Sequence, residues 1–191
     1  MERYILPNVL AQGFDEVLVV GMTGVSGVEP GVRYLDPEPI WKNTQDALMK
    51  RDLAALASES DVLVYLADDH RFYTPGFAHV LRASWSDHRW DALVPQRVTV
   101  REGATIALPN GFYDPRNPVV PGQGYIAGHC GIYRRAALRA APWLTVRPRD
   151  PWWDVRHTAA LRAAGGVVQE ASGLEVEDIE HLLKPESAPW R

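Results

Sequence analysis

The chain has 191 residues, of which 46% are hydrophobic and 23% are charged, as expected for a globular protein with one sizeable core. Its net charge of -4 carries no general signature of nucleic-acid or membrane binding. The single cysteine, Cys130, excludes an intrachain disulfide and a cysteine zinc site. No apolar run is long enough to cross a bilayer, and the first residues lack the apolar region of a signal peptide. We therefore expect a cytoplasmic protein with a single domain.

Hydrophobic spacing predicts the elements of the first part of the chain. Residues 3–12 have the pattern of a short amphipathic helix, and residues 16–21 that of a buried strand that ends at a glycine. A glycine-rich turn leads to a short strand over 32–35, and residues 44–58 carry the apolar stripe of a helix.

An apolar run over 61–66 is followed by Asp68, Asp69 and His70. A continuous apolar run predicts a strand buried on both faces, and ligands of α/β sheets bind at the carboxyl ends of such strands. Three side chains able to bind a hard metal ion therefore stand where a site is expected. The alternative is that one of the two acids caps the next helix while the histidine lies in solvent.

The second half continues the alternation of helices and strands. The pattern predicts a helix over 75–84, a strand over 92–95, a hairpin and long loop over 97–124, renewed order over 126–138, a helix over 154–164 that ends at a glycine pair, and late strands over 167–168 and 174–179. The long loop is a candidate lid or acceptor-binding segment. The alternation indicates an α/β fold with a mostly parallel central sheet flanked by helices.

Four stretches follow one another in a distinctive order: a basic helical segment at 50–57, the apolar strand with its acidic end at 62–70, a small-residue segment at 128–135, and a helix opened by an acid at 153–165. This order resembles the GT-A glycosyltransferases, most nearly those of the family 2 type, over almost the whole chain. The resemblance implies a minimal GT-A (Rossmann-like) domain over 1–183 with a flexible tail over 184–191. It also implies transfer of a sugar, with inversion, from a nucleotide-sugar donor to a hydroxyl group, with a UDP-sugar as the favoured donor.

The same resemblance implies a site for Mn²⁺ or Mg²⁺. Asp69 falls on the acid that the family uses most directly on the metal, and Asp68 falls on the middle position of the motif. Ala67 stands where the first acid is usual, so His70 would replace the missing oxygen donor. His181 resembles a late histidine that helps to bind the metal or the diphosphate.

The resemblance also implies residues that contact the donor. Arg51 occupies the basic position near the nucleotide, and Asp52 stands where the family commonly has asparagine. Asp68 would contribute here as well as to the metal. Lys184, in the tail, would close over the donor.

On the acceptor side, Asp154 falls on the residue that serves as general base in inverting members, and Trp153 replaces the glutamate that usually precedes it. A carboxylate in this position can accept the proton of the attacking hydroxyl. The acceptor-binding candidates are Gly128, His129, Trp152, Trp153 and His157. Simple helix capping by Asp154, and packing roles for the histidines and at least one tryptophan, remain open alternatives.

The start of the chain differs from the family. Residues 6–17 resemble the first helix leading into the second strand, so the first strand and part of the uridine-binding wall are expected to be absent.

The short form and the motifs at 50–52, 65–70 and 128–135 resemble the TET-associated glycosyltransferases of bacteriophages. That resemblance implies 5-hydroxymethylcytosine in phage DNA as the acceptor, and the host cytoplasm as the location. Arginines between 97 and 149 would supply phosphate contacts and the tryptophan pair would receive a flipped base, although the acidic net charge argues against a DNA partner. The alternatives are a glycan, protein or small-molecule acceptor, a sugar nucleotidyltransferase, for which residues 21–31 are a poor phosphate loop, and a non-catalytic relative.

Overall fold

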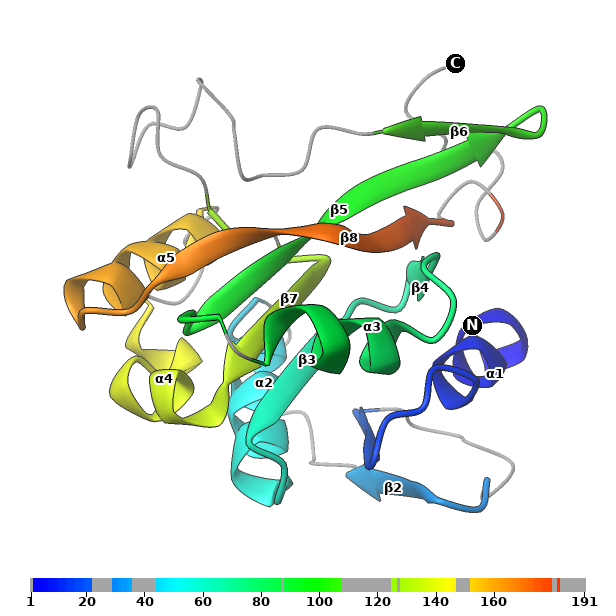
Figure 1. Cartoon of the computed structure of the whole chain (residues 1–191). Coiled ribbons are helices and arrows are strands. Elements are labelled where there is room, and N and C mark those ends of the chain that lie inside the picture. Colours follow the sequence, from blue (N-terminus) through cyan, green and yellow to red (C-terminus); the bar gives the residue numbers. More distant parts are fainter. Residues whose placement is uncertain are drawn as a thin grey trace.

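Helices on both sides of a central sheet make up the fold (Figure 1). The computed structural model describes residues 2–21, 29–35, 44–86, 88–107, 125–126, 128–146, 152–179 and 182. The elements in chain order are α1 (Glu2–Leu10), β1 (Val17–Val20), β2 (Val32–Leu35), α2 (Thr44–Ala57), β3 (Val62–Leu66), β4 (His70–Phe72), α3 (Phe77–Trp85), β5 (Ala92–Arg101), β6 (Ala104–Ala107), β7 (Cys130–Arg134), α4 (Arg135–Ala140), the 3-10 helix η2 (Trp143–Thr145), α5 (Trp153–Ala163) and β8 (Val168–Asp178).

The central sheet has the strand order β3-β7-β5-β8-β4, with β6 paired to β5. The predicted α/β class is confirmed, but the prediction that the strands are mostly parallel is wrong for this sheet. Among its described pairs only β5 and β8 run parallel, and the other four are antiparallel. A short connection explains one of these antiparallel pairs, β5 and β6, since a parallel neighbour needs a long crossover. Strand β6 returns from β5 through a two-residue turn at Glu102 and Gly103, which both have positive φ.

The core lies on both faces of the sheet because successive strand residues point to opposite sides. Tyr133 packs with Trp143 and with residues of α2, α4 and α5, whereas its neighbour Ile132 packs on the other face with α3. Val9 brings α1 against this second cluster. The sheet is thereby covered by three helices on one face and two on the other.

The two late strands of the prediction form one irregular strand, β8. Its pairing with β5 shifts register between Pro95 and Gln96, and Gly173 in β8 has a φ of 82°. The irregularity lies in the stretch that the sequence pattern left unassigned between the two predicted strands. The short strand β4 and the 3-10 helix η2 were not predicted.

Strands β1 and β3 depart from the prediction in one further way. Strand β3 was expected to be buried on both faces and β1 to be a buried strand, but every residue of both strands is only half-buried. Strand β1 pairs with β2 in a separate two-stranded parallel sheet, and β3 is an edge of the central sheet. The two strands line a common groove, which explains their partial exposure.

Three predicted segments lie largely outside the described residues. These are the glycine-rich turn, for which residues 22–28 are not described, the loop beyond Ala107, of which the structure describes only the β5–β6 hairpin at its start, and the tail over 184–191. In the described part of the chain, no helix combines the length and the apolar character needed to span a membrane.

Candidate functional site

The start of β7 joins the acidic end of β3 to the beginning of α5. The backbone N–H of Ala67 donates to the carbonyl of His129 at 2.8 Å, which fixes the 128–129 segment beside the acidic motif. The backbone N–H of Gly128 donates to a carboxylate oxygen of Asp154 at 3.2 Å. The acidic motif at the end of β3 and Asp154, which come from separate parts of the sequence, are therefore hydrogen-bonded to two consecutive residues, His129 and Gly128.

Asp69 and His70 form a hydrogen-bonded pair. The His70 Nδ1 lies 2.5 Å from Asp69 Oδ1, and because an ionised carboxylate only accepts, Nδ1 carries the proton. This hydrogen bond lowers the pKa of Asp69 and keeps its carboxylate charged. The alternative of helix capping is excluded, since α3 begins at Phe77 and Gly76 is its N-cap residue. The alternative of a solvent-exposed histidine is excluded too, because His70 is 3% exposed.

His129 stacks on His70 with ring centroids 4.9 Å apart and an angle of 20° between the ring planes. The Nε2 atoms of both rings are buried, and neither has a hydrogen-bond partner within the described residues. Burial lowers the pKa of His129 to about 3, and the nearby His70 and Arg97 act in the same direction. A neutral imidazole is the form that binds a metal ion or accepts a hydrogen bond.

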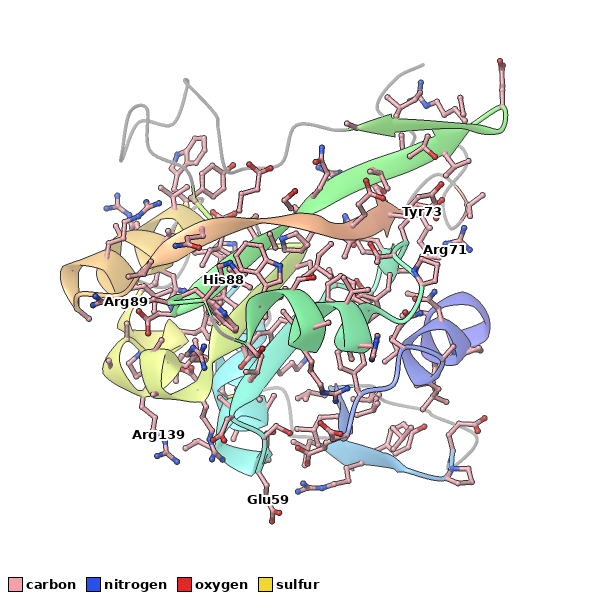
Figure 2. The ribbon with its side chains drawn as sticks, in the orientation of Figure 1. Glu59, Arg71, Tyr73, His88, Arg89 and Arg139 are labelled. Atoms are coloured by element: carbon pink, nitrogen blue, oxygen red, sulfur yellow. The ribbon has the colours of Figure 1, made fainter. Side chains whose placement is uncertain are left out.

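The end of strand β8 packs next to Asp69, His70 and His129. Asp178, which is 1% exposed, forms an ion pair with Arg97, and Ile179 donates its N–H to the carbonyl of Asp69 at 2.9 Å. Glu177 accepts a hydrogen bond from Arg71 at 2.7 Å. Figure 2 shows Arg71 of β4 and the nearby Tyr73 beside the end of β8. Strand β8 is thus hydrogen-bonded to Asp69 through Ile179, and Arg97 of the Arg97–Asp178 ion pair is close enough to help lower the pKa of Asp69.

The Asp69 and His70 side chains meet some, but not all, of the requirements of a divalent-cation site. Asp69 offers a charged oxygen on a side chain that is 40% exposed, and His70 offers a buried nitrogen lone pair without a partner in the described part. A ligating histidine commonly donates its other N–H to a carboxylate, which is the arrangement of this pair. The described residues contain no group of three or more His, Cys, Asp or Glu able to hold a metal ion. Asp68 is exposed beside the pair, and His181 lies outside the described residues.

Asp154 lies in the first turn of α5 and is not the N-cap residue, which is Trp152 and makes no side-chain capping hydrogen bond. Its Oδ1 accepts the N–H of Val155 at 2.8 Å, and its Oδ2 accepts the N–H of Gly128. Burial raises the pKa of Asp154, and these hydrogen bonds lower it by less. A carboxylate with a raised pKa is a stronger proton acceptor than a free aspartate.

Arg51 is enclosed by three aromatic rings. Its guanidinium lies 5.5 Å from the ring centroid of Tyr65, 4.8 Å from that of Trp143 and 5.0 Å from that of Trp153. It donates to the carbonyl of Gly128 at 2.5 Å. The structure thus gives Arg51 the task of positioning the Gly128 segment, and its predicted contact with the donor stays a prediction.

Asp52 stabilises the 3-10 helix η2. Its two carboxylate oxygens accept the N–H groups of Trp143 and Leu144, both at 2.9 Å. Burial raises the pKa of Asp52 although these hydrogen bonds oppose the shift. Donor contacts by Asp52 remain a prediction, and Lys184 lies outside the described residues.

His157 is fully buried and stacks on Trp143, with ring centroids 3.5 Å apart. Its Nε2 donates to the carbonyl of Ala141 at 2.9 Å, so Nδ1 is unprotonated. Burial lowers the pKa of His157 to about 3. These contacts are those of a packing residue, and the acceptor-binding role of His157 stays a prediction.

This burial predicts an acid-dependent loss of stability. The unfolded chain binds a proton at His157 near its ordinary pKa of about 6.5, whereas the folded chain does so only near the lowered value. The contribution is therefore complete above pH 6.5 and decreases as the pH falls from there toward 3. The free energy of unfolding should fall by up to about 1.4 kcal/mol per pH unit through this group.

The measurement is urea unfolding at several pH values between 8 and 4.5, for the parent and for His157→Gln, which keeps a side-chain N–H donor. The variant is expected to be less stable at pH 8 and to lose less stability on acidification. Comparison of the two slopes cancels the opposing contributions of the buried carboxylates. Identical slopes would contradict the prediction.

Trp153 packs directly over Gly128. A Cβ atom at Gly128 would lie 2.6 Å from two atoms of the indole ring, so the close approach requires glycine. The same ring contacts Trp143 at a centroid distance of 5.5 Å. One face of Trp153 is therefore used in packing. Trp152 is half-buried, and contact of either tryptophan with an acceptor remains a prediction.

Several arginines predicted to contact phosphate have internal partners instead. Arg97 pairs with Asp178, Arg134 donates to the carbonyl of Trp90 at 2.7 Å, and Arg135 donates to that of Ser58 at 2.8 Å. Arg139 is exposed, and Figure 2 shows its side chain pointing away from the protein. Arg116, Arg147 and Arg149 lie outside the described residues.

Comparison with known proteins gives similarity at the level of the fold. No protein-family model and no curated protein sequence matches the chain. The crystal structure of GalNAc-T7 with UDP, GalNAc and Mn²⁺ has a TM-score of 0.63 and 12% identity, over 91% of this chain and 39% of that one. The crystal structure of HddC from Yersinia pseudotuberculosis has a TM-score of 0.50 and 13% identity, over 92% of this chain and 77% of that one.

These likenesses confirm a GT-A-like fold. The chain spans well under half the length of the GalNAc-T7 chain. At 12% and 13% identity they establish the fold alone.

Proposed function

We propose that the chain is a metal-dependent glycosyltransferase that moves a sugar from a nucleotide-sugar donor, favourably a UDP-sugar, to a hydroxyl acceptor with inversion. The observation that carries the proposal is that His70 stacks on His129 while the preceding residue, Gly128, donates to Asp154, so the Asp69–His70 pair and Asp154 both contact one short segment. This reaction requires a charged group that binds a cation and a carboxylate that accepts a proton. The GT-A-like fold supports the same proposal by analogy, as does the UDP and Mn²⁺ in the GalNAc-T7 structure.

In the proposed reaction the hydroxyl oxygen attacks the anomeric carbon from the side opposite the diphosphate. The new carbon–oxygen bond forms while the bond to the leaving phosphate oxygen breaks, and that oxygen keeps the electron pair. Asp154 accepts the proton of the hydroxyl, aided by its raised pKa. Gly128 holds the Asp154 carboxylate in place through its N–H, and Arg51 holds the carbonyl of Gly128.

A divalent cation would be held by Asp69, assisted by Asp68, His70 and His181. When bound, Mn²⁺ or Mg²⁺ supplies Lewis-acid stabilisation of the negative charge that develops on the diphosphate. The hydrogen bond from His70 keeps the Asp69 carboxylate ionised for this purpose. Gly128, His129 and Trp153 would line the acceptor side.

We further propose 5-hydroxymethylcytosine in phage DNA as the acceptor, which rests on the sequence resemblance. The base carries an exposed hydroxymethyl group, so it meets the requirement for a hydroxyl nucleophile. An aromatic residue such as Trp152 would stack on a flipped base. The internal pairing of several arginines leaves fewer positive charges for phosphate than the sequence indicates.

The test is transfer from radiolabelled UDP- and GDP-sugars, with Mn²⁺, to DNA with and without 5-hydroxymethylcytosine. We expect label on modified DNA alone, and we expect Asp69→Asn to lose both transfer and metal-dependent donor binding. Donor binding without transfer to DNA would keep the donor site and overturn the DNA acceptor. Incorporation of nucleoside monophosphate into product would identify a nucleotidyltransferase instead, and absence of donor binding in the parent would overturn the enzyme proposal.

A further inference from the structure

A groove of about 910 Å³ separates β1 from β3. Its walls include every residue of 17–21 and of 61–68, so both strands line it along their whole length. Among the described residues, β1 pairs only with β2, and β3 pairs only with β7. Two strand edges therefore border one cavity.

The hydrogen-bond pattern shows which peptide groups of β3 face the groove. Arg135 donates to the carbonyl of Asp61, and Ala67 donates to that of His129, so these two residues direct their peptide groups toward β7. Neighbouring residues of a strand alternate in this direction. The N–H and C=O groups of Val62, Val64 and Leu66 consequently point into the groove.

The same argument applies to β1. The N–H of Gly21 donates to the carbonyl of Leu35 at the end of β2, so Val17, Val19 and Gly21 face that strand. The peptide groups of Leu18 and Val20 point the other way, into the groove. Within the part of the chain that the structure describes, five residues on two strand edges thus present unpaired backbone hydrogen-bonding groups to one groove.

Helices cover the groove from both sides. Ile5 and Leu6 of α1 and Leu81 of α3 contribute apolar side chains, as do Ala47 and Ala54 of α2. A strand with helices on both faces is apolar on both faces. This environment is that of an internal strand of an α/β sheet, and it agrees with the apolar but half-buried residues of β1 and β3.

We propose that the groove binds an extended, apolar strand of a partner polypeptide, which hydrogen-bonds to both edges and joins the two sheets. Alternating N–H and C=O groups at strand spacing are complementary in partial charge to another strand, the basis of β-strand addition. A small ligand of similar volume would fill the space without pairing both edges. The groove reaches Gly21 and Asp68, so the bound strand ends beside the acidic site.

The test uses a capped seven-residue peptide, Lys-Thr-Val-Val-Val-Thr-Lys, added to the full chain. Amide hydrogen exchange is measured residue by residue. We expect saturable binding that raises the melting temperature by several degrees and slows exchange at least ten-fold at the amides of Leu18, Val20, Val62, Val64 and Leu66. The amides of Leu63 and Tyr65, which serve the β7 pairing, should change less.

Two controls separate strand addition from side-chain binding. A peptide of the same sequence with N-methylated backbone nitrogens keeps its side chains but loses its donors, and it should not bind. Val64→Pro removes one groove-facing N–H that β7 does not use, which an edge strand tolerates. This variant should keep the circular dichroism of the parent and bind the peptide at least ten-fold more weakly.

Three results would overturn the proposal. The first is peptide binding that leaves the five groove-facing amides unprotected. The second is equal affinity for the N-methylated peptide. The third is protection of these amides in peptide-free protein that rises with protein concentration, which would identify a second copy of the chain as the occupant. The outcome does not depend on transfer activity, so it is independent of the proposed enzymatic function.

Discussion

Asp154→Asn is expected to lower the rate of sugar transfer by about 10²- to 10⁴-fold, the range that general acid–base catalysis contributes. The asparagine has nearly the same shape but accepts no proton from the attacking hydroxyl. Donor binding should be unchanged, because the Asp154 carboxylate hydrogen-bonds to the Gly128 and Val155 backbone rather than to the Asp69–His70 pair. The effect should therefore appear in kcat rather than in the dissociation constant of the donor.

The pH dependence gives a second readout of the same residue. Because burial raises the pKa of Asp154, the parent rate should fall on acidification below this raised pKa, as the protonated carboxyl no longer accepts a proton. This acid limb should disappear in Asp154→Asn. Asp61→Asn, at a side chain that is 95% exposed, is a matched control and should keep both the rate and the limb. A variant at Asp154 with parental kcat would exclude it as the base.

The fold was predictable where the hydrophobic period is strong. The strand at 32–35 has the bounds that its pattern predicts, and the helix at 44–57 ends one residue earlier than predicted. Strand direction was not predictable, since parallel and antiparallel strands share the same two-residue alternation. The three residues of β4 are too few to show any period, which is why His70 could not be assigned to a buried strand.

Burial of a strand depends on neighbours that the sequence does not reveal. The apolar runs of β1 and β3 indicate strands in apolar surroundings, but they do not tell whether a hydrogen-bonded strand lies alongside. The groove between them is therefore a property of the tertiary arrangement. The expected absence of the first strand of the family was the only sequence signal that pointed to this region.

The candidate site was predictable in parts. Asp69 and His70 are adjacent in the sequence, so their pairing requires only a local turn. The contact of Gly128 with Asp154 spans 26 residues, and only the family resemblance brought these two together. The role of Trp143 was missed, because a single tryptophan followed by a leucine has no pattern that separates a core residue from a surface one.

Trp143→Ala is expected to lower the free energy of unfolding by about 3–5 kcal/mol, the usual cost of removing a buried large aromatic side chain. Trp143 is fully buried and contacts the rings of Tyr65, Tyr133, Trp153 and His157. It also lies under the Arg51 guanidinium, whose cation–π contact is worth a further ~0.5–2 kcal/mol. The alanine variant leaves a cavity in the middle of these rings.

Urea unfolding of three variants tests whether this residue supports the site as well as the core. Leu144→Ala changes the neighbouring side chain, which is 44% exposed, and should cost well under half as much as Trp143→Ala. Trp143→Phe keeps an aromatic face for His157 and Arg51 and should fall between the two. Arg51, which Trp143 contacts, donates to Gly128, and Gly128 donates to Asp154. The transfer rate should therefore be lowest for Trp143→Ala, intermediate for Trp143→Phe and highest for Leu144→Ala, even at temperatures where all three variants are folded. A Trp143→Ala protein within about 1 kcal/mol of the parent would show that the ring cluster repacks without it.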